Sequence, residues 1–317
     1  MGIARSALLW ASTNRILRRM APRVWFVRRA LRRFMPGETL EDGLEAAETF
    51  RRLGIPTLFT HLGENVAGRR EAIHATEDYL RAIDRVEALG LDTEVSVKLT
   101  HLGLDLDPGL AAENYLRLVR RAAERGDTAW IDMESSEYVE RTLEVYRTTL
   151  EASPNAGLCL QAYLHRTRAD LEDLLPLGPS IRLVKGAYRE DPELALQRPD
   201  EIDEAFLGLS VTLLRGLQEG KVRRYAAGSH DLRLLGRVAT ASRDLGVSVK
   251  DWEIEMLYGI RHADQLELTR RGYPVRTLIS YGPAWYPWYV RRLAEKPGEN
   301  LAYVLRNVFT SAPTASG

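Results

Sequence analysis

Charged side chains interrupt several short apolar segments of this sequence near the point where each segment ends. These side chains are Lys98 in VSVKL, Lys185 in RLVKG and Asp132 in WIDM. Burying a charge is costly unless the charge is paired or used, so such residues indicate a binding or catalytic site. Polar residues in corresponding places are His61, Glu64, Glu134, Gln161, His230, Asp231, Glu253, Glu255 and Tyr281, with Arg291 and Arg292 following near the C-terminus.

Three kinds of chemistry are compatible with this set. A desolvated lysine could act as an amine nucleophile, and a metal site could draw on His61, Asp132, His165 and His230. No HxH or HExxH motif is present to bring metal ligands together, so we expect no metal. Several cations with a carboxylate, a glutamine and aromatic rings better suit a carboxylate-bearing substrate held against a large cofactor with phosphates.

The elements that must position these residues alternate regularly after Pro36. We predict eight strands, over residues 56–62, 94–99, 129–133, 157–163, 181–186, 222–229, 249–254 and 275–280. Segments with helical apolar periodicity lie between them, which is typical of parallel strands joined by crossover helices. Eight such units predict an α/β fold, a closed (β/α)8 barrel of the TIM type, with an open doubly wound sheet as the alternative. In such a barrel the polar residues at the strand ends meet at one mouth.

Composition excludes other classes of protein. The 317 residues include 44 basic and 44 acidic side chains, so the net charge is zero and we expect no nucleic-acid partner. No apolar run approaches the ~18 residues of a membrane-spanning helix, and none near the start is long enough for a signal peptide. The single cysteine, Cys159, has apolar neighbours and fits a buried thiol in a reducing cytoplasm.

The zero net charge hides an asymmetry between two predicted regions. Residues 1–37 carry nine arginines and no acidic residue, so the arm is +9 and residues 38–317 are −9. Trp10, Trp25 and Phe26 lie among these arginines, a mixture typical of an amphipathic helix on an anionic membrane surface. The alternative is a helical arm packed on its own domain with a solvated arginine face. We therefore predict a basic helical arm, a catalytic domain, and a cytoplasmic protein with candidate peripheral contact at the inner face of the membrane.

Seven segments occur in an order that resembles the blocks of the proline dehydrogenase family. They are VSVKLTHLG (95–103), WIDMESSEYVERTL (130–143), LCLQAYLHRT (158–167), IRLVKGAYRE (181–190), GSHD (228–231), EIEMLYGIR (253–261) and WYVRRLAEKPGEN (288–300). The resemblance spans roughly residues 38 to 308 and does not cover the basic arm. It implies a monofunctional FAD enzyme whose catalytic domain is a (β/α)8 barrel.

The resemblance also implies roles for individual residues. Lys98, Arg291 and Arg292 match substrate-binding cations, and Asp132 matches an active-site aspartate that would hold the Lys98 ammonium. Arg182 matches an arginine whose charge stabilises the reduced flavin. The residues that match cofactor-binding positions are Met133, Gln161, Lys185, Gly186, Ala187, Ser229 and His230.

Five further residues are candidates for a gate or for support of the site. The resemblance implies that Glu295 holds the orientation of Arg291. Glu64 is either a gate that pairs with Arg291 or an ordinary loop acid. The remaining three are Tyr281, Tyr258 and Leu278, and the aromatic pair is equally compatible with core packing.

The implied reaction transfers a hydride from C5 of L-proline to flavin N5, which yields Δ1-pyrroline-5-carboxylate, and the electrons pass to a membrane quinone. Leu278 stands where the family commonly has a tyrosine, which favours hydroxyproline or another secondary amine as an alternative substrate. Two alternatives come from other classes of protein. One is a lyase or hydrolase barrel without flavin, and the other is a peripheral membrane protein without catalytic activity.

Overall fold

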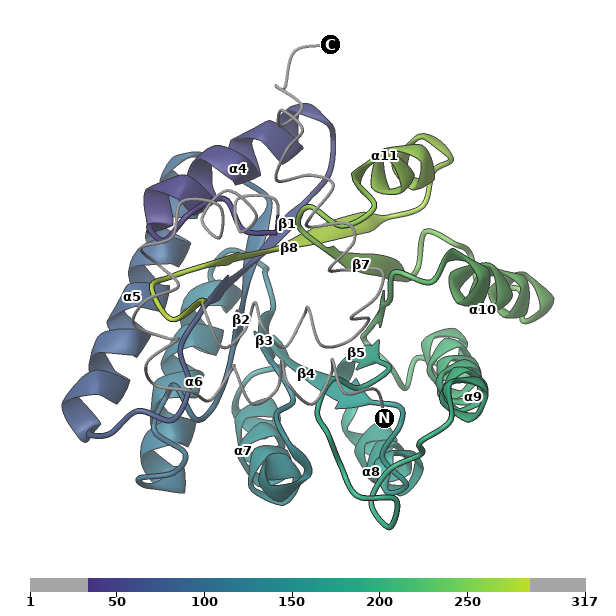
Figure 1. The fold of residues 1–317 in the computed structure, drawn as a ribbon, viewed down its shortest axis with the longest axis horizontal. Coiled ribbons are helices and arrows are strands. Elements are labelled where there is room, and N and C mark those ends of the chain that lie inside the picture. Colours follow the sequence, from purple (N-terminus) through teal and green to yellow (C-terminus); the bar gives the residue numbers. More distant parts are fainter. Residues whose placement is uncertain (1–33, 286–317) are drawn as a thin grey trace, which may run out of the picture.

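The computed structural model describes residues 34–285, which form a closed barrel of eight parallel strands (Figure 1). Each strand pairs with the next one in the chain, and β8 closes the barrel on β1 with Thr57 opposite Thr277 and His61 opposite Tyr281. Helices surround the barrel, as the crossovers between parallel strands require (Figure 1). The predicted (β/α)8 barrel is confirmed, and the open doubly wound sheet is wrong because the sheet has no edge.

The strands lie close to their predicted positions, with one exception. They are β1 Thr57–His61, β2 Thr93–Val97, β3 Ala129–Ile131, β4 Ala156–Gln161, β5 Ser180–Val184, β6 Arg224–Gly228, β7 Glu253–Leu257 and β8 Val275–Tyr281. The seventh strand was predicted over 249–254 and begins later. The amide of Ser248 donates to Asp251 Oδ2 at 3.2 Å, and the amide of Asp251 donates to the Ser248 carbonyl at 3.0 Å. Because of these two bonds, residues 248–251 form a turn, although the apolar pattern predicts that a strand begins at Val249.

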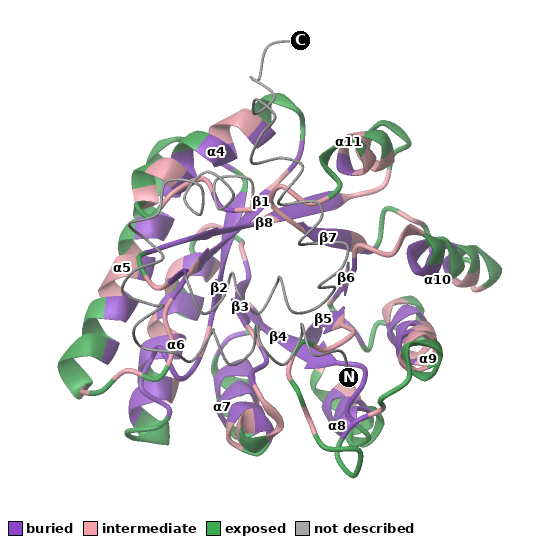
Figure 2. Ribbon diagram, in the orientation of Figure 1, coloured by how far each residue is buried: buried purple, intermediate pink, exposed green. Residues whose placement is uncertain are grey.

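The helices pack one face on the barrel, as their apolar periodicity requires. They are α4 Leu40–Arg52, α5 Arg69–Ala88, α6 Pro108–Ala123, α7 Val139–Ala152, α8 Thr167–Leu174, α9 Pro199–Gln218, α10 Leu232–Asp244 and α11 His262–Arg270, with short 3-10 turns η2 Ser136–Tyr138 and η3 Leu175–Leu177. Thr39 and Asp42 form a reciprocal capping box at the start of α4, and Asp107 caps α6. Figure 2 shows the buried side of each helix facing the strands.

The main apolar core therefore lies between the strands and the helices. Tyr79 of α5, Tyr115 of α6 and Phe206 of α9 are fully buried in it. A smaller apolar cluster fills the middle of the barrel itself and consists of Leu58, Trp130 and Ala226, with Leu278 packed against it. Because side chains alternate along a strand, these four residues identify the inward-facing positions of β1, β3, β6 and β8.

Buried charges close the N-terminal end of the barrel. Arg224 of β6 bonds Glu253 of β7 at 2.7 Å and also pairs with Glu94 of β2, while Arg276 of β8 bonds Glu253 at 3.1 Å. Glu94 also accepts from the indole nitrogen of Trp130 at 2.8 Å. The prediction that Glu253 lies at the opposite mouth is wrong, because β7 begins at this residue rather than ending near it.

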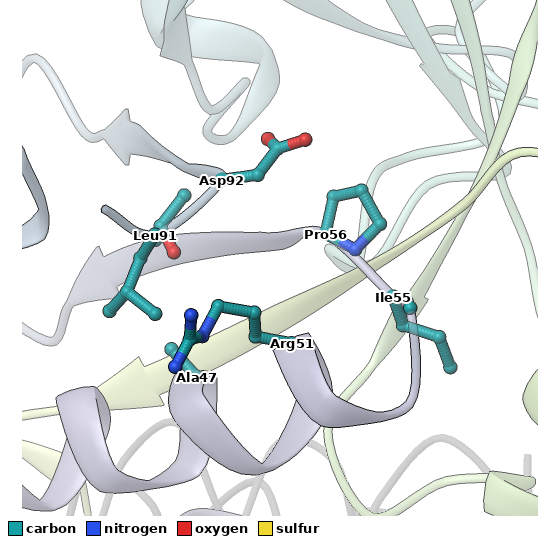
Figure 3. A pocket seen from close by; sticks show the side chains of 8 residues that line it. Ala47, Arg51, Ile55, Pro56, Leu91 and Asp92 are labelled. Carbon is teal, nitrogen blue, oxygen red and sulfur yellow. The ribbon is translucent and has the colours of Figure 1, made fainter. Parts of the chain in front are cut away.

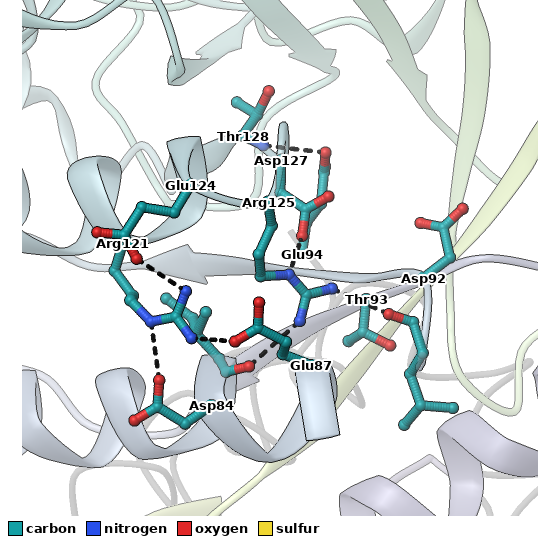
Figure 4. A network of polar contacts seen from close by, with 12 residues as sticks. Asp84, Glu87, Asp92, Thr93, Glu94, Arg121, Glu124, Arg125, Asp127 and Thr128 are labelled. Carbon is teal, nitrogen blue, oxygen red and sulfur yellow. Dashed lines mark hydrogen bonds and ion pairs between the residues drawn. The ribbon is translucent and has the colours of Figure 1, made fainter. Parts of the chain in front are cut away.

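A second ionic network joins α5 to α6 on the outer surface (Figure 4). Arg121 of α6 bonds Asp84 at 2.8 Å and also pairs with Glu87, both on α5. Arg125 bonds Asp127 at 2.7 Å and donates to the Leu91 carbonyl at 3.0 Å. The network holds the two helices together at the end of the barrel where the strands begin.

A hollow lies at the same N-terminal end, between the end of α4 and the starts of β1 and β2 (Figure 3). Its lining residues are Ala47, Arg51, Gly54, Ile55, Pro56, Leu91, Asp92 and Thr93. The polar residues predicted to form the site are not among them, and those within residues 34–285, apart from Glu253, lie towards the other ends of the strands. Between residues 34 and 285, no helix is long and apolar enough to cross a membrane.

Candidate active site

A buried guanidinium lies in the C-terminal half of the barrel, surrounded by side chains of three other strands. Arg182 of β5 bonds Glu255 of β7 at 3.2 Å and Ser96 Oγ of β2 at 2.9 Å, and it also pairs with Asp132 just after β3. Ser96 Oγ in turn donates to Asp132 Oδ1 at 2.7 Å. We call these four residues the Arg182 cluster. Its formation brings together Asp132 and Arg182, the two residues predicted to be catalytic.

The electrostatics of this cluster follow from its burial. Arg182 is 3% exposed; burial alone would lower its pKa, but the carboxylates of Glu255 and Asp132 raise it, so the guanidinium stays charged. Burial raises the pKa of Glu255 to about 7, against the opposing effect of Arg182. The guanidinium carbon also lies 5.6 Å from the ring centroid of Trp130, within the range of a cation–π contact. The cluster therefore holds one permanent positive charge in a fixed orientation.

Lys98 does not make the contact expected of it. Asp132 pairs with Arg182 rather than with Lys98. Ser96 of β2 bonds both Asp132 and Arg182, whereas Lys98 lies two residues further along the chain, just after the end of β2. The Lys98 ammonium instead lies 4.0 Å from Glu64 Oε2. Its side chain is 13% exposed, so the ammonium is largely shielded from solvent at the strand end. The predicted pairing of Glu64 with Arg291 lies outside the described residues.

Gln161 connects the ends of three neighbouring strands. Its side-chain nitrogen donates to the Glu134 carbonyl at 2.8 Å, and its side-chain oxygen accepts from the Ala187 amide at 3.4 Å. Glu134 accepts from the Thr100 amide and hydroxyl at 3.1 and 2.7 Å. Burial raises the pKa of Glu134 to about 6. These bonds fix the segments that follow β2, β3, β4 and β5 relative to one another.

Gly186 follows β5 in a backbone conformation that favours glycine. Its φ of +123° is unfavourable for other residues, and an added Cβ would lie 2.3 Å from the ring of Tyr163. Tyr163 is buried, and its amide donates to the Lys185 carbonyl at 2.9 Å. The glycine therefore lets the backbone after β5 pack directly on the tyrosine ring.

Replacing Gly186 by alanine should lower the free energy of unfolding by about 1–3 kcal/mol, because backbone strain and the clash with Tyr163 add. Gly178→Ala is the matched control, since Gly178 also has a positive φ, +66°, but nothing lies within 4 Å of its added Cβ. Urea unfolding of both variants gives the comparison. Equal losses of unfolding free energy in the two variants would show that the clash of the added Cβ with Tyr163 contributes nothing.

Lys185 points to the outer side of the barrel mouth. Its ammonium pairs with Asp203 of α9 and lies 3.2 Å from Asp231 Oδ2. Asp231 caps α10 by accepting from two amides, and its own amide donates to Ser229 Oγ at 3.2 Å. The structure thus brings Lys185, Ser229 and the adjacent His230 together at the ends of β5 and β6.

Two aromatic candidates for the gate lie outside the barrel mouth. The Tyr281 ring stacks on His61, with centroids 5.1 Å apart, and contacts Gly43 of α4. Tyr258 packs on Phe50 of α4 with centroids 5.9 Å apart. Side chains alternate between the inside and the outside of the barrel along each strand, and both tyrosines point outward, where they pack in the core between strands and helices. Leu278 points inward.

Three residues of the site were not assigned a role from the sequence. They are Ser96, Trp130 and Glu255, which contact Arg182 from three different strands. The signal for Ser96 was the two-residue period of β2, which places residues 94, 96 and 98 on one face. Arg291, Arg292 and Glu295 lie outside the described residues. Within residues 34–285 no group of three or more histidine, cysteine, aspartate or glutamate side chains could hold a metal ion.

Comparison with known proteins identifies the family. The model of the family described as proline dehydrogenase matches residues 43–300. This chain belongs to the proline dehydrogenase family. Proline dehydrogenase 1 of Bacillus subtilis subsp. natto is 34% identical over 306 residues, which cover 96% of this chain and 98% of that protein. The proline dehydrogenase of Deinococcus radiodurans is 32% identical over 281 residues, 87% of this chain and 89% of that one.

Solved structures agree on the fold. Proline utilization A from Bdellovibrio bacteriovorus, crystallised after inactivation by N-propargylglycine, aligns with 98% of this chain at a TM-score of 0.78 and 21% identity. This chain spans 41% of that longer protein. The Bradyrhizobium japonicum protein of the same name, as the mutant D778Y, aligns at a TM-score of 0.72. The proline dehydrogenase relatives match over nearly the whole chain, so the chain is an oxidoreductase that acts on proline.

Proposed function

We propose that this proline dehydrogenase uses FAD to oxidise L-proline to Δ1-pyrroline-5-carboxylate and passes the electrons to a membrane quinone. The observation that carries the proposal is the buried Arg182 guanidinium, oriented by the side chains of Ser96, Asp132 and Glu255 in the C-terminal half of the barrel. Catalytic groups of (β/α)8 enzymes lie at this end. A fixed positive charge there stabilises negative charge that develops in a bound cofactor.

The donor set at the strand ends fits FAD. Gln161 offers an amide whose orientation is already set by two hydrogen bonds, and the segment with Gly186 and Ala187 after β5 offers backbone. Ser229 and His230 supply a hydroxyl and an imidazole, and Met133 lies buried after β3. The Lys185 ammonium lies beside Ser229 and His230, where it pairs with Asp203 and Asp231. When bound, FAD supplies the acceptor for the hydride, and these residues hold it.

Substrate binding is proposed for Lys98, together with Arg291 and Arg292. Glu64 lies 4.0 Å from the Lys98 ammonium, which is longer than a hydrogen bond. A substrate carboxylate can therefore make a shorter contact with the ammonium than Glu64 does. We further propose that Glu64 is the gate residue and that Glu295 orients Arg291.

A second candidate substrate class is supported by Leu278. This side chain lies inside the barrel with Leu58, Trp130 and Ala226, and it is partly exposed. An aliphatic residue here leaves more room and a less polar wall than a tyrosine would. Hydroxyproline or another secondary amine is the alternative substrate that this wall would admit.

One assay tests the function and the substrate together. Purified protein should show the visible absorbance of a flavin and should reduce an artificial electron acceptor when given L-proline. Hydroxyproline, pipecolate and N-methyl amino acids complete the panel, and the highest kcat/KM identifies the preferred substrate. A colourless protein that is inert towards the whole panel would contradict the proposal and would favour a barrel without flavin or a peripheral membrane protein.

We also propose that residues 1–37 bring the enzyme to the inner face of the cytoplasmic membrane, where quinones are found. The support is the +9 charge and the interleaved aromatic residues of this arm. The full chain should cosediment with anionic vesicles and be released by salt, because lipid attraction at the surface is screened. A variant with these nine arginines changed to serine should stay in solution and keep its turnover with a soluble acceptor. Equal cosedimentation of both proteins would contradict a role for the arm.

A further inference from the structure

Arg182 has one more carboxylate than its charge requires. Asp132 accepts from both the guanidinium and Ser96 through the same oxygen, Oδ1, and its side chain is 21% exposed. Glu255 contacts the same guanidinium through Oε2 at 3.2 Å, and its side chain is 3% exposed. With both carboxylates ionised, the Arg182 cluster would carry one net negative charge inside the barrel.

The two oxygens of Glu255 have different surroundings. Oε2 accepts from Arg182, whereas Oε1 is buried without a hydrogen-bond partner among the described residues. A buried carboxylate oxygen with no donor is costly, and the cost falls when the group is protonated. Asp132 receives both of its donors at Oδ1, and because its side chain is 21% exposed it has no buried oxygen without a donor. The geometry therefore assigns the exchangeable proton of the cluster to Glu255 rather than to Asp132.

The remaining charges around Glu255 come from the barrel interior. Arg276 of β8 lowers its proton affinity, and Glu253 of β7 and Glu94 of β2 raise it, while Arg182 and its partner Asp132 lie beside it. Burial is the largest effect and brings the pKa of Glu255 to about 7. Arginines remain charged throughout the physiological range, so Arg182 and Arg276 do not exchange protons there.

We propose that Glu255 is a positioning residue for Arg182 that exchanges a proton with solvent, so that the Arg182 cluster is neutral with the proton and singly negative without it. This inference deepens the proposed function and rests on it for the meaning of the charge. A reduced cofactor carries more negative charge than an oxidised one and disfavours a negative neighbour. Glu255 therefore gains a proton from solvent when the site is reduced and returns it to solvent on reoxidation.

The first test reads the proton in the folded protein without using activity. A carboxyl whose pKa is higher in the folded state than in the unfolded state binds more protons when folded, so stability falls as pH rises between the two values. For Glu255 this range is from about 4.5 to about 7. From pH 5 to pH 8 the unfolding equilibrium constant of the wild type should therefore rise about tenfold or more relative to that of Glu255→Gln. Parallel pH profiles would overturn the proposal.

The matched control is Glu253→Gln, which removes a carboxylate two residues away on the same face of β7. Glu253 bonds Arg224 and Arg276, and both arginines keep their charge over this range. This variant keeps Glu255, so its stability should still fall from pH 5 to pH 8, by a smaller factor than in the wild type because Glu253 raises the pKa of Glu255. Comparison with each variant also removes the contribution of Glu134, which titrates in the same range in all three proteins.

The second test reads the coupling to reduction. Above pH 7 the midpoint potential of the bound flavin should fall more steeply with pH in the wild type than in Glu255→Gln, by the equivalent of one proton per two electrons. Equal slopes would overturn the coupling. If Glu255→Gln does not fold, an indicator dye counts the protons that the wild type takes up on reduction, and an uptake that does not change between pH 6 and pH 9 would overturn it. Because unfolding needs no flavin, a failure of the proposed function leaves the first test intact.

Discussion

Arg182→Met should abolish turnover, with a loss of kcat of at least about 10²–10³-fold, and should also lower the free energy of unfolding by about 3–5 kcal/mol. The first effect follows because the variant removes the only positive charge of the Arg182 cluster. The second follows because methionine fills a similar space but leaves the half-buried Asp132 and the buried Glu255 without their counterion. Methionine is apolar, so the loss is of charge and hydrogen bonds rather than of volume.

Arg182→Lys separates charge from geometry. Lysine keeps the positive charge, but a single ammonium cannot reproduce the planar fork that contacts Glu255 through one nitrogen and Ser96 and Asp132 through the other. We expect stability to recover more than kcat does. The measurements are kcat with L-proline and urea unfolding, with Arg237→Met as the control, since its pair with Glu204 is on the surface and should contribute under 1 kcal/mol. Near-normal kcat in Arg182→Met would contradict the proposed role.

Glu94→Leu should have the opposite pattern, with a large loss of stability and a small loss of turnover per folded molecule. Glu94 is buried at the N-terminal end of the barrel, where it pairs with Arg224 and accepts from the Thr128 amide and the Trp130 indole. Removing it leaves buried donors unsatisfied, at a cost of about 3–5 kcal/mol. Residues at this end of a (β/α)8 barrel contribute to stability rather than to chemistry.

Urea unfolding and single-turnover kinetics on the folded fraction give the two quantities for Glu94→Leu. The control is Glu87→Gln, which removes a carboxylate from the surface network of Arg121. That carboxylate is 52% exposed, and its loss should cost under 1 kcal/mol. A stability loss for Glu94→Leu as small as that of the control would mean that the buried network contributes little.

Local pattern was sufficient for most of the fold. Strand β8 and most of the other strands could be placed because each is a short apolar run between turn residues. Strand β7 was misplaced because Val249 has a high strand propensity. In the structure the Asp251 side chain accepts from the Ser248 amide, and the Asp251 amide donates to the Ser248 carbonyl, so this segment forms a turn. That error moved Glu253 from one end of the barrel to the other.

The candidate site was partly predictable for the same reason. Lys98, Asp132, Gln161 and Arg182 could be located because each falls at or near a strand end or matches a family motif. Which of these residues pair with each other could not be predicted. Asp132 could pair with Lys98 or with Arg182, and the relative stagger of β2, β3 and β5 selects Arg182. Tyr281 shows the same limit, because one position along β8 separates the barrel interior from the layer beneath α4.

The sequence by itself determined the barrel, the family and the residue types at the strand ends, because these depend on periodicity and on motifs of a few adjacent residues. The tertiary structure decided that Arg182 has two carboxylate partners, that Lys98 faces Glu64, and that one oxygen of Glu255 is buried without a donor. These facts join residues as far apart as 96, 132, 182 and 255. Closure of the barrel sets the register of every strand against its neighbours, and that register places the four side chains at one level.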